Sequence, residues 1–267
     1  MAVHPIERLR YVARAGSVDA GELVREAAGA LGGMGSDPTG LVLSCKRLVD
    51  RQPTAGPLWW LCARMLAAAD PRAEAWRCVD ELDEDPTGRR LADELPDVAR
   101  VTVLGWPELV GEALPRRGDL EVLVVDAAGE GTAFARRLRG ADVDAEDVPE
   151  GSTAGAAVAS DVVVLEPTAM GAGRLLAPAG SLAAAAVARY AGVPVWAVAG
   201  AGRALPGPLW EALVGRLDLE APWEADVELV PLDLVDVVLG PGGRTTADRA
   251  ATRADCGVAA ELLEREG

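Results

Sequence analysis

Two carboxylates directly follow buried runs of apolar residues, where they could act as an acid and a base. Asp126 comes after Val122–Val125, and Glu166 comes after Val162–Leu165. Ligands of open α/β sheets bind beyond the carboxyl ends of the strands, and a carboxylate placed there can transfer protons. Glu166 could instead cap a neighbouring helix, and we favour this structural role. Glu166 with Asp126 or Cys256 remains the alternative catalytic set.

A glycine-rich loop is expected between the strand that ends at Leu165 and the next helix. Gly171, Gly173 and Gly180 permit positive φ and close backbone approach. Ser181 is expected to cap the helix over about 182–190 by accepting an early backbone N–H. A helix N-terminus offers unpaired N–H groups and the positive end of the helix dipole, and both favour a phosphate. We therefore expect an anion-binding loop here.

Two further glycine motifs need to be weighed. The stretch 126–131 lies between a strand and a helix, as a dinucleotide fingerprint would, but Phe134 stands where the third glycine is required. No nicotinamide or flavin cofactor is therefore predicted. The stretch Gly240-Pro-Gly-Gly-Arg244 has the glycines and the cation of an anion-binding nest. A turn before the last helix is the simpler interpretation, and no lysine follows these glycines as it would in a nucleoside triphosphate site.

The four cysteines, at positions 45, 62, 78 and 256, show no C-x-x-C spacing, and His4 is the single histidine. This set lacks the ligand spacing of a zinc site, so no metal is predicted. Three of the cysteines fall on amphipathic helical patterns, where a thiol is typically a small buried apolar group.

The net charge limits the kinds of partner. The chain has 267 residues, of which 42 are acidic and 26 basic, and its net charge is -16. Such a charge opposes nucleic acids and anionic membrane surfaces. No apolar run approaches the about 20 residues that span a bilayer, and the first residues lack a signal-peptide core. We expect a cytoplasmic protein whose partners are proteins and small molecules.

The hydrophobic pattern changes character once along the chain. From Pro5 to about Ala92, apolar residues recur every three or four positions, which predicts an N-terminal helical domain over 1–96. Helix breaks are expected at 32–33, 37–38, 53, 70–71 and 85–86.

From Val98 onward, short apolar runs alternate with helical patterns. This alternation predicts an α/β domain over 97–267, a Rossmann-like doubly wound parallel sheet. The expected strands are 101–104, 122–125, 162–165, 195–198 and 237–239. The acidic stretch 142–150 is expected to be a solvated connection between elements.

The segment from Asp161 to Gly200 resembles the alpha/beta/delta regulatory-subunit family of translation initiation factor 2B. That family includes ribose-1,5-bisphosphate isomerase and methylthioribose-1-phosphate isomerase. The resemblance rests on the strand opened by Asp161, the glycine loop, the Gly180-Ser181 helix start and the Gly-Val-Pro-Val strand at 192–195. Similar motifs occur in the same order at 14–16, 52–55 and 230–239. The resemblance implies an N-terminal helical bundle, a C-terminal Rossmann-like sheet and a homodimer formed through the sheet domain.

The resemblance also implies a site from which the reactive groups are missing. The family's catalytic cysteine aligns near Trp106 and its aspartate aligns with Thr168, and neither replacement exchanges protons near pH 7. Its Asn-Lys pair aligns with Ala177-Pro178, which removes an amide and a charge from the phosphate site. The ligand-binding residues that the resemblance implies are Arg14, Arg51, Thr54, Gly171, Gly173, Arg174, Gly180 and Ser181.

These observations predict a regulatory or binding protein with a degenerate sugar-phosphate isomerase site that senses a phosphorylated metabolite. One alternative is an active aldose–ketose isomerase with relocated groups, since that reaction needs a placed acid and base. The other is a structural subunit of a protein complex with an exposed apolar patch. Trp59, Trp60, Trp210 and Trp223 could contribute to that patch, although burial is expected for at least two of them.

Overall fold

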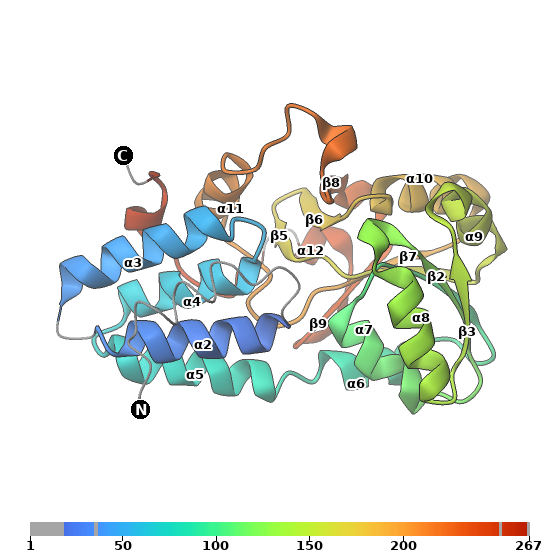
Figure 1. The fold of residues 1–267 in the computed structure, drawn as a ribbon, viewed down its shortest axis with the longest axis horizontal. Coiled ribbons are helices and arrows are strands. Elements are labelled where there is room, and N and C mark those ends of the chain that lie inside the picture. The colour runs from blue at the N-terminus through green and yellow to red at the C-terminus, as the bar shows by residue number, and fades with distance from the viewer. Residues whose placement is uncertain (1–18, 35–36, 251–252, 266–267) are drawn as a thin grey trace.

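The computed structural model describes residues 19–34, 37–250 and 253–265. Its N-terminal part is a group of helices that begin and end at the predicted breaks (Figure 1). Asp37 and Asp70 each accept a backbone N–H at the start of a helix that opens with proline, a residue that needs no N–H at that position. The helices are α2 (Ala20–Gly32), α3 (Pro38–Arg51), α4 (Gly56–Ala67), α5 (Pro71–Asp83) and α6 (Thr87–Glu94).

A seven-stranded sheet follows, in the order β10-β9-β7-β4-β1-β2-β3. Neighbouring strands are parallel, except that β10 pairs antiparallel with β9. The predicted α/β class is confirmed, and all five predicted strands are present. The strands are β1 (Arg100–Leu104), β2 (Glu121–Val125), β3 (Asp144–Val148), β4 (Val162–Leu165), β7 (Val195–Val198), β9 (Val237–Gly240) and β10 (Gly243–Thr245).

Helices cover both faces of this sheet, which explains the apolar runs without alternation. Val162 and Val164 of β4 lie in one apolar core, and Val163 and Leu165 lie in another, as expected for a strand buried on both faces. One face carries α6, α7 (Glu108–Ala113) and α8 (Gly131–Gly140). The other face carries α9 (Thr153–Ala159), α10 (Ser181–Ala191) and α12 (Ala247–Ala250). Helix α6 precedes residue 97 but packs with the sheet.

Two segments that we expected to be irregular are strands. The acidic stretch contains the edge strand β3, in which Ala145 faces the core while its acidic neighbours face solvent, so the expected solvated connection is wrong. Burial of one face specifies the register of a strand, and Ala145 contributes to that burial here. The expected loop after β4 contains a hairpin of β5 (Ala169–Gly171) and β6 (Arg174–Pro178), and β8 (Val227–Pro231) extends it into a second sheet.

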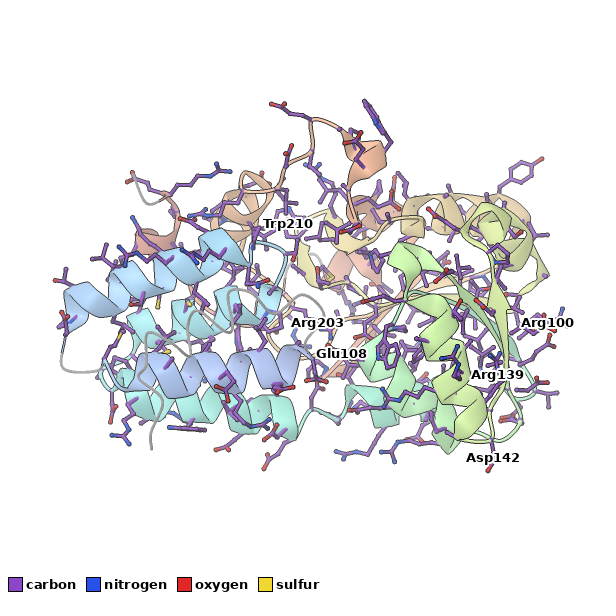
Figure 2. The ribbon with its side chains drawn as sticks, viewed as in Figure 1. Arg100, Glu108, Arg139, Asp142, Arg203 and Trp210 are labelled. Atoms are coloured by element: carbon purple, nitrogen blue, oxygen red, sulfur yellow. The ribbon has the colours of Figure 1, made fainter. Side chains whose placement is uncertain are left out.

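The helical part and the sheet part share an apolar core. Trp210 of α11 (Gly207–Val214), which Figure 2 labels, belongs to this core. The same core contains Trp59 of α4 and Leu176 of β6. The two parts also share a backbone hydrogen bond, in which Gly56 donates its N–H to the carbonyl of Thr168 over 3.2 Å. The first turn of α4 therefore lies directly against the segment that follows β4.

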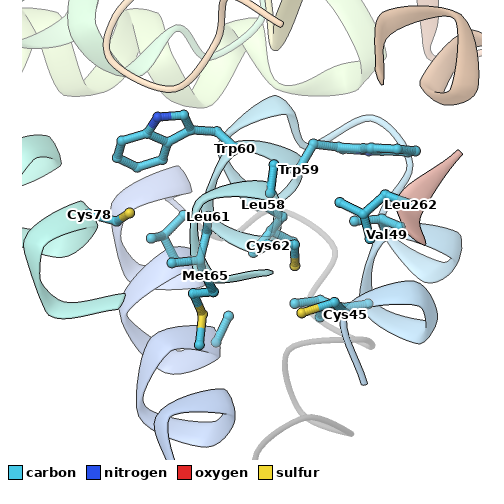
Figure 3. Close-up of a cluster of buried hydrophobic side chains, with 14 of the residues drawn as sticks. Cys45, Val49, Leu58, Trp59, Trp60, Leu61, Cys62, Met65, Cys78 and Leu262 are labelled. Carbon is cyan, nitrogen blue, oxygen red and sulfur yellow. The ribbon is translucent and has the colours of Figure 1, made fainter. Parts of the chain in front are cut away.

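Helix α4 is the centre of the helical part. Trp59 and Trp60 are 0% and 1% exposed, and Trp210 is 1% exposed, whereas Trp223 is 80% exposed. Burial is therefore the correct prediction for three of these four indoles. Cys45, Cys62 and Cys78 are buried free thiols among the same side chains (Figure 3), as predicted for small apolar groups.

Candidate functional site at the carboxyl edge of the sheet

Glu166 directly follows β4, at the edge of the sheet where ligands of this fold class bind. Its Oε1 accepts the backbone N–H of Glu108 over 3.2 Å, and its Oε2 accepts that of Val110 over 3.0 Å. Oε1 also lies 2.8 Å from Nη2 of Arg203. The side chain is 4% exposed, so this carboxylate is a buried cap on the first turn of α7.

Arg203 comes from the loop after β7, the strand that pairs with β4. Its Nη1 donates to the carbonyl of Pro167 over 2.8 Å, and its side chain is 8% exposed. A buried charge needs both a counter-charge and hydrogen-bond partners, and Arg203 obtains both from the segment after β4. The ion pair therefore joins the ends of two adjacent strands.

Glu108 is the second carboxylate beside Arg203, as Figure 2 shows. Its Oε2 lies 3.5 Å from Nη2 of Arg203, and its Oε1 accepts the N–H of Ala20 over 2.9 Å. Burial raises the pKa of Glu108 to about 7, against the opposing effect of Arg203. Because Ala20 is the first residue of α2, this carboxylate connects the helical part to the sheet.

Asp85 makes a second connection of the same kind. Its Oδ1 accepts the N–H of Thr87 over 2.9 Å, and its Oδ2 accepts the N–H of Ala201 over 2.7 Å. A Cβ on Gly200 would lie 2.5 Å from Oδ2 of Asp85, so the backbone after β7 lies very close to this carboxylate. Asp85 therefore connects the helical part to the carboxyl end of β7.

Asp126 follows β2 and caps α8. Its Oδ1 accepts the N–H of Gly131 over 2.8 Å and lies 3.4 Å from the N–H of Thr132. A Cβ on Gly131 would meet the backbone of Asp126 at 2.6 Å, so this glycine permits close approach between the strand end and the helix. Asp126 and Glu166 therefore have the same structural role. Each follows a strand and accepts backbone N–H groups at the N-terminus of a helix.

Trp106 and Thr168 occupy the positions where the family resemblance places its reactive cysteine and aspartate. The Trp106 ring lies 5.6 Å from the ring of Phe134, with the Arg137 guanidinium 5.5 Å above it. Thr168 lies at the base of the hairpin, where its N–H donates to the carbonyl of Leu176 over 2.8 Å. Among residues 19–34, 37–250 and 253–265, the recorded side-chain contacts of Trp106 and Thr168 include no carboxylate and no imidazole.

The N-terminus of α10 differs from the expected anion site. Gly180 precedes the helix with φ 91°, and the Ser181 side chain does not cap it, so the predicted Ser181 cap is wrong. Oε1 of Glu228, from β8, accepts the N–H of Leu182 over 2.7 Å instead. A carboxylate of this chain therefore occupies the position at which a phosphate is favoured.

The glycine loop is not one site, because the β5–β6 hairpin separates its two ends. Gly171 is buried directly against the indole of Trp210, and Gly173 forms the hairpin turn with φ 87°. Arg174 is exposed beside that turn. It is separated from Pro178 by the length of β6, about 13 Å for four residue steps. Gly171, Gly173 and Arg174 therefore lie at the opposite end of β6 from Gly180 and Ser181.

The remaining predicted residues are dispersed. Arg51 is exposed at the end of α3, and Thr54 is half-buried in the turn that packs against Thr168. Arg14 lies outside the described residues, as does His4. Burial raises the pKa of the Cys256 thiol to about 12, which leaves little thiolate at neutral pH.

Arg203, Glu108, Asp85 and Glu228 were not predicted from the sequence. Arg203 had a detectable signal, since it follows the strand 195–198 and the glycines at 200 and 202, and strand ends in this fold class carry functional groups. The partners of the other three depend on which elements the fold places side by side.

A cavity of about 540 Å³ lies at the opposite, amino edge of the sheet, lined in part by Arg100, Glu121, Asp144 and Asp161. The described residues hold no cluster of three or more potential metal-binding side chains. Within the same residues, no helix is both long and apolar enough to cross a membrane.

Comparison with known proteins identifies the fold. No family model and no curated protein matches the sequence. The structure is similar to translation initiation factor eIF-2B of Pyrococcus horikoshii OT3, with a TM-score of 0.78 and 13% identity over 94% of this chain and 100% of that chain. It is also similar to a chain of the tetrameric eIF2B-beta2-delta2 complex of C. thermophilum, with a TM-score of 0.73 and 18% identity over 92% of both chains. The chain has the eIF2B-subunit fold, which confirms the fold predicted from the resemblance.

Proposed function

We propose that this chain is a regulatory or binding protein of the initiation factor 2B regulatory-subunit type, and that the position of its sugar-phosphate isomerase site is not catalytic. Glu166 supports this proposal most directly. It is the acid nearest in the sequence to Thr168, the position of the missing aspartate. Its two oxygens, however, are bound by α7 and by Arg203. Both oxygens are therefore engaged inside the protein, and a substrate could reach them only if these buried contacts were broken, which is costly.

The other groups of a relocated isomerase are equally unsuited. Asp126 binds the first turn of α8. Cys256 has a thiol pKa raised to about 12 by burial, so its reactive thiolate form is scarce at neutral pH. Aldose–ketose conversion needs an acid and a base that face the same substrate. Glu166 and Asp126 instead bind the first turns of helices, and Cys256 is a thiol whose pKa burial raises.

A turnover assay tests the absence of catalysis. Purified protein incubated with ribose 1,5-bisphosphate, or with methylthioribose 1-phosphate, is expected to form product no faster than a protein-free control. Turnover that disappears in Asp126→Asn or Cys256→Ala, while the unfolding temperature is unchanged, would establish the isomerase alternative.

Ser181 favours a second function, which is to sense a phosphorylated metabolite without converting it. Its Oγ is buried and has no hydrogen-bond partner within the described residues. It lies in the first turn of α10, where backbone N–H groups and the helix dipole favour a phosphate. Glu228 competes for this position through its bond to Leu182.

Calorimetric titration with ribose 1,5-bisphosphate tests the sensing function. Saturable binding by the wild type that becomes tighter in Glu228→Gln supports it, because that change removes the competing charge but keeps the side-chain size. Heats that match buffer dilution for both proteins would exclude this sugar phosphate as the ligand of α10 and leave a protein-binding function.

The outer surface of α9 and α10 supports a second copy of this chain as one partner. The two helices lie side by side (Figure 1). Tyr190 is 94% exposed, Val158 is 55% exposed and Leu182 is 37% exposed. The charged Arg189 on this surface pairs with Asp236 over 3.1 Å. Two chains of net charge -16 would repel one another least through a surface this poor in acidic residues.

A further inference from the structure

The hairpin turn between β9 and β10 is a motif that the proposed function does not use. Gly243 pairs with Gly240 in the antiparallel register, so Pro241 and Gly242 form the turn. Gly243 has φ 91°, a conformation that residues with a Cβ rarely adopt. The turn follows the carboxyl end of β9, at the ligand-binding edge of the sheet.

Three arginines from three different segments meet at this turn. A Cβ placed on Gly242 would lie 2.5 Å from Nη1 of Arg253, and one placed on Gly243 would lie 2.8 Å from Nη1 of Arg90. Arg244 is the next residue of β10. Arg90 comes from α6 and Arg253 from the segment after α12, so long-range packing rather than a local charge run brings both side chains to the same turn.

Carboxylates only partly neutralise these guanidinium groups. Arg244 lies 3.3 Å from Glu94 and over the ring of Trp196. The Nε of Arg253 is 3.9 Å from Oδ1 of Asp255, and the other oxygen of Asp255 accepts the N–H of Ala204.

The backbone N–H of Arg90 donates to the carbonyl of Pro86, but its guanidinium group has no hydrogen bond or ion pair among the described residues. The Nη1 atoms of Arg90 and Arg253 therefore lie beside the turn without a carboxylate of their own. In a chain of net charge -16, this arrangement is a local concentration of positive charge.

We propose that the turn 240–244, together with Arg90 and Arg253, binds a phosphate group of a phosphorylated small molecule. Two guanidinium groups match the charge of a phosphate dianion, and their planar N–H forks match its oxygens. The two glycines let the guanidinium groups approach the backbone of the turn closely, which a Cβ at either position would obstruct. This site is separate from α10, whose N-terminus Glu228 occupies, and the proposal does not rest on the proposed function.

The charge balance predicts how binding depends on salt. Arg244 and Arg253 each have a side chain that is 50% exposed, so their attraction for an anion is screened by salt. Binding is therefore expected at low ionic strength and is expected to weaken as sodium chloride is added.

Calorimetric titration with sodium pyrophosphate tests the site in the full-length protein at low ionic strength. We expect saturable binding that weakens at least tenfold in the double variant R90Q/R253Q. The control is R72Q/R136Q, which removes the same charge from exposed positions on α5 and α8 and is expected to bind as the wild type does. Circular dichroism checks that each variant is folded.

A second variant acts through geometry instead of charge. Gly242→Ala keeps every arginine but places a methyl group against Nη1 of Arg253, and it is expected to weaken binding severalfold. Equal affinity in the wild type and R90Q/R253Q, or no saturable heat with the wild type, would overturn the proposal. Tighter binding of a polyglutamate peptide than of pyrophosphate would overturn it too, because it would assign the arginines to an acidic protein partner.

Discussion

Nη2 of Arg203 lies 2.8 Å from Oε1 of Glu166, with the two side chains 8% and 4% exposed. The pair joins the loop after β7 to the end of β4, two strands that are adjacent in the sheet but lie far apart in the sequence. Each partner has further hydrogen bonds, Glu166 to α7 and Arg203 to the carbonyl of Pro167. These contacts give Glu166 a structural role at the junction of the two strand ends.

Replacing Glu166 by Gln is expected to lower the free energy of unfolding by about 3–5 kcal/mol, because it leaves Arg203 buried without its closest counter-charge. Urea unfolding followed by circular dichroism measures the change. The double variant E166Q/R203M removes both charges, and it should recover part of the loss. A catalytic role would give the opposite result, in which E166Q is as stable as the wild type but has lost an activity that the wild type shows.

The stability of the protein should depend on the protonation of Glu108, whose pKa burial raises to about 7. Because the folded state holds this proton more tightly than the unfolded state, the contribution is complete below the ordinary pKa of 4.5 and is lost as the pH rises to about 7. Over this pH range we expect the free energy of unfolding to fall by about 2 kcal/mol. This is less than the whole pKa shift of Glu108 would give, because its side chain is 28% exposed and solvent screens its charge.

The measurement is urea unfolding at several pH values between 4.5 and 8. Glu112, Glu130 and Asp255 also have a raised pKa, mainly through burial, so the wild type alone does not isolate Glu108. The difference in unfolding free energy between the wild type and Glu108→Gln does isolate it. The unfolding free energy of the wild type minus that of Glu108→Gln should fall as the pH rises, because only the wild type loses stability when Glu108 is deprotonated. A difference that does not change with pH would contradict the assignment.

The helices and the central strands could be predicted because their signals are local. Pairs such as Asp70-Pro71 mark helix starts by capping chemistry, and the run 162–165 marks a strand buried on both faces. The strand β3 was missed because its acidic residues are typical of solvent, and β5 was missed because three residues carry too little pattern.

The candidate site was harder to predict because its contacts are long-range. Glu228 reaches Leu182 across 46 residues, and only the pairing of β6 with β8 brings Glu228 close to α10. Phosphate binding at the N-terminus of α10 stays a prediction, and the sequence could not show that the carboxylate of Glu228 accepts a backbone N–H there. Gly171 and Gly173 both indicate a loop when the sequence is read alone. In the structure, the hairpin places Gly171 in strand β5 and Gly173 in the turn.

Gly171 and Gly173 should respond differently to the same substitution. A Cβ on Gly171 would overlap the indole of Trp210, whereas a Cβ on Gly173 would meet no atom within 4 Å. Gly171→Ala is therefore expected to destabilise the fold by about 3 kcal/mol through overpacking. Gly173→Ala should cost about 1 kcal/mol through its positive φ. Thermal unfolding compares them, and equal losses would contradict a packing role for Gly171.

Self-association through α9 and α10 should depend on Tyr190. Tyr190→Asp adds a negative charge to a surface otherwise poor in acidic residues, so it should shift a dimer to monomer by repulsion between copies. Because Tyr190 is 94% exposed, the unfolding temperature should not change. Sedimentation velocity at several concentrations measures the mass.

The control for self-association is Val98→Asp, which adds the same charge at another exposed apolar position, 80% accessible, outside α9 and α10. It should leave the dimer intact, because its charge lies away from the proposed interface. If both variants lose the dimer, the net charge of the chain, and not the surface of α9 and α10, controls association. A monomeric wild type would exclude a second copy at this surface and leave a different protein as the partner of Tyr190.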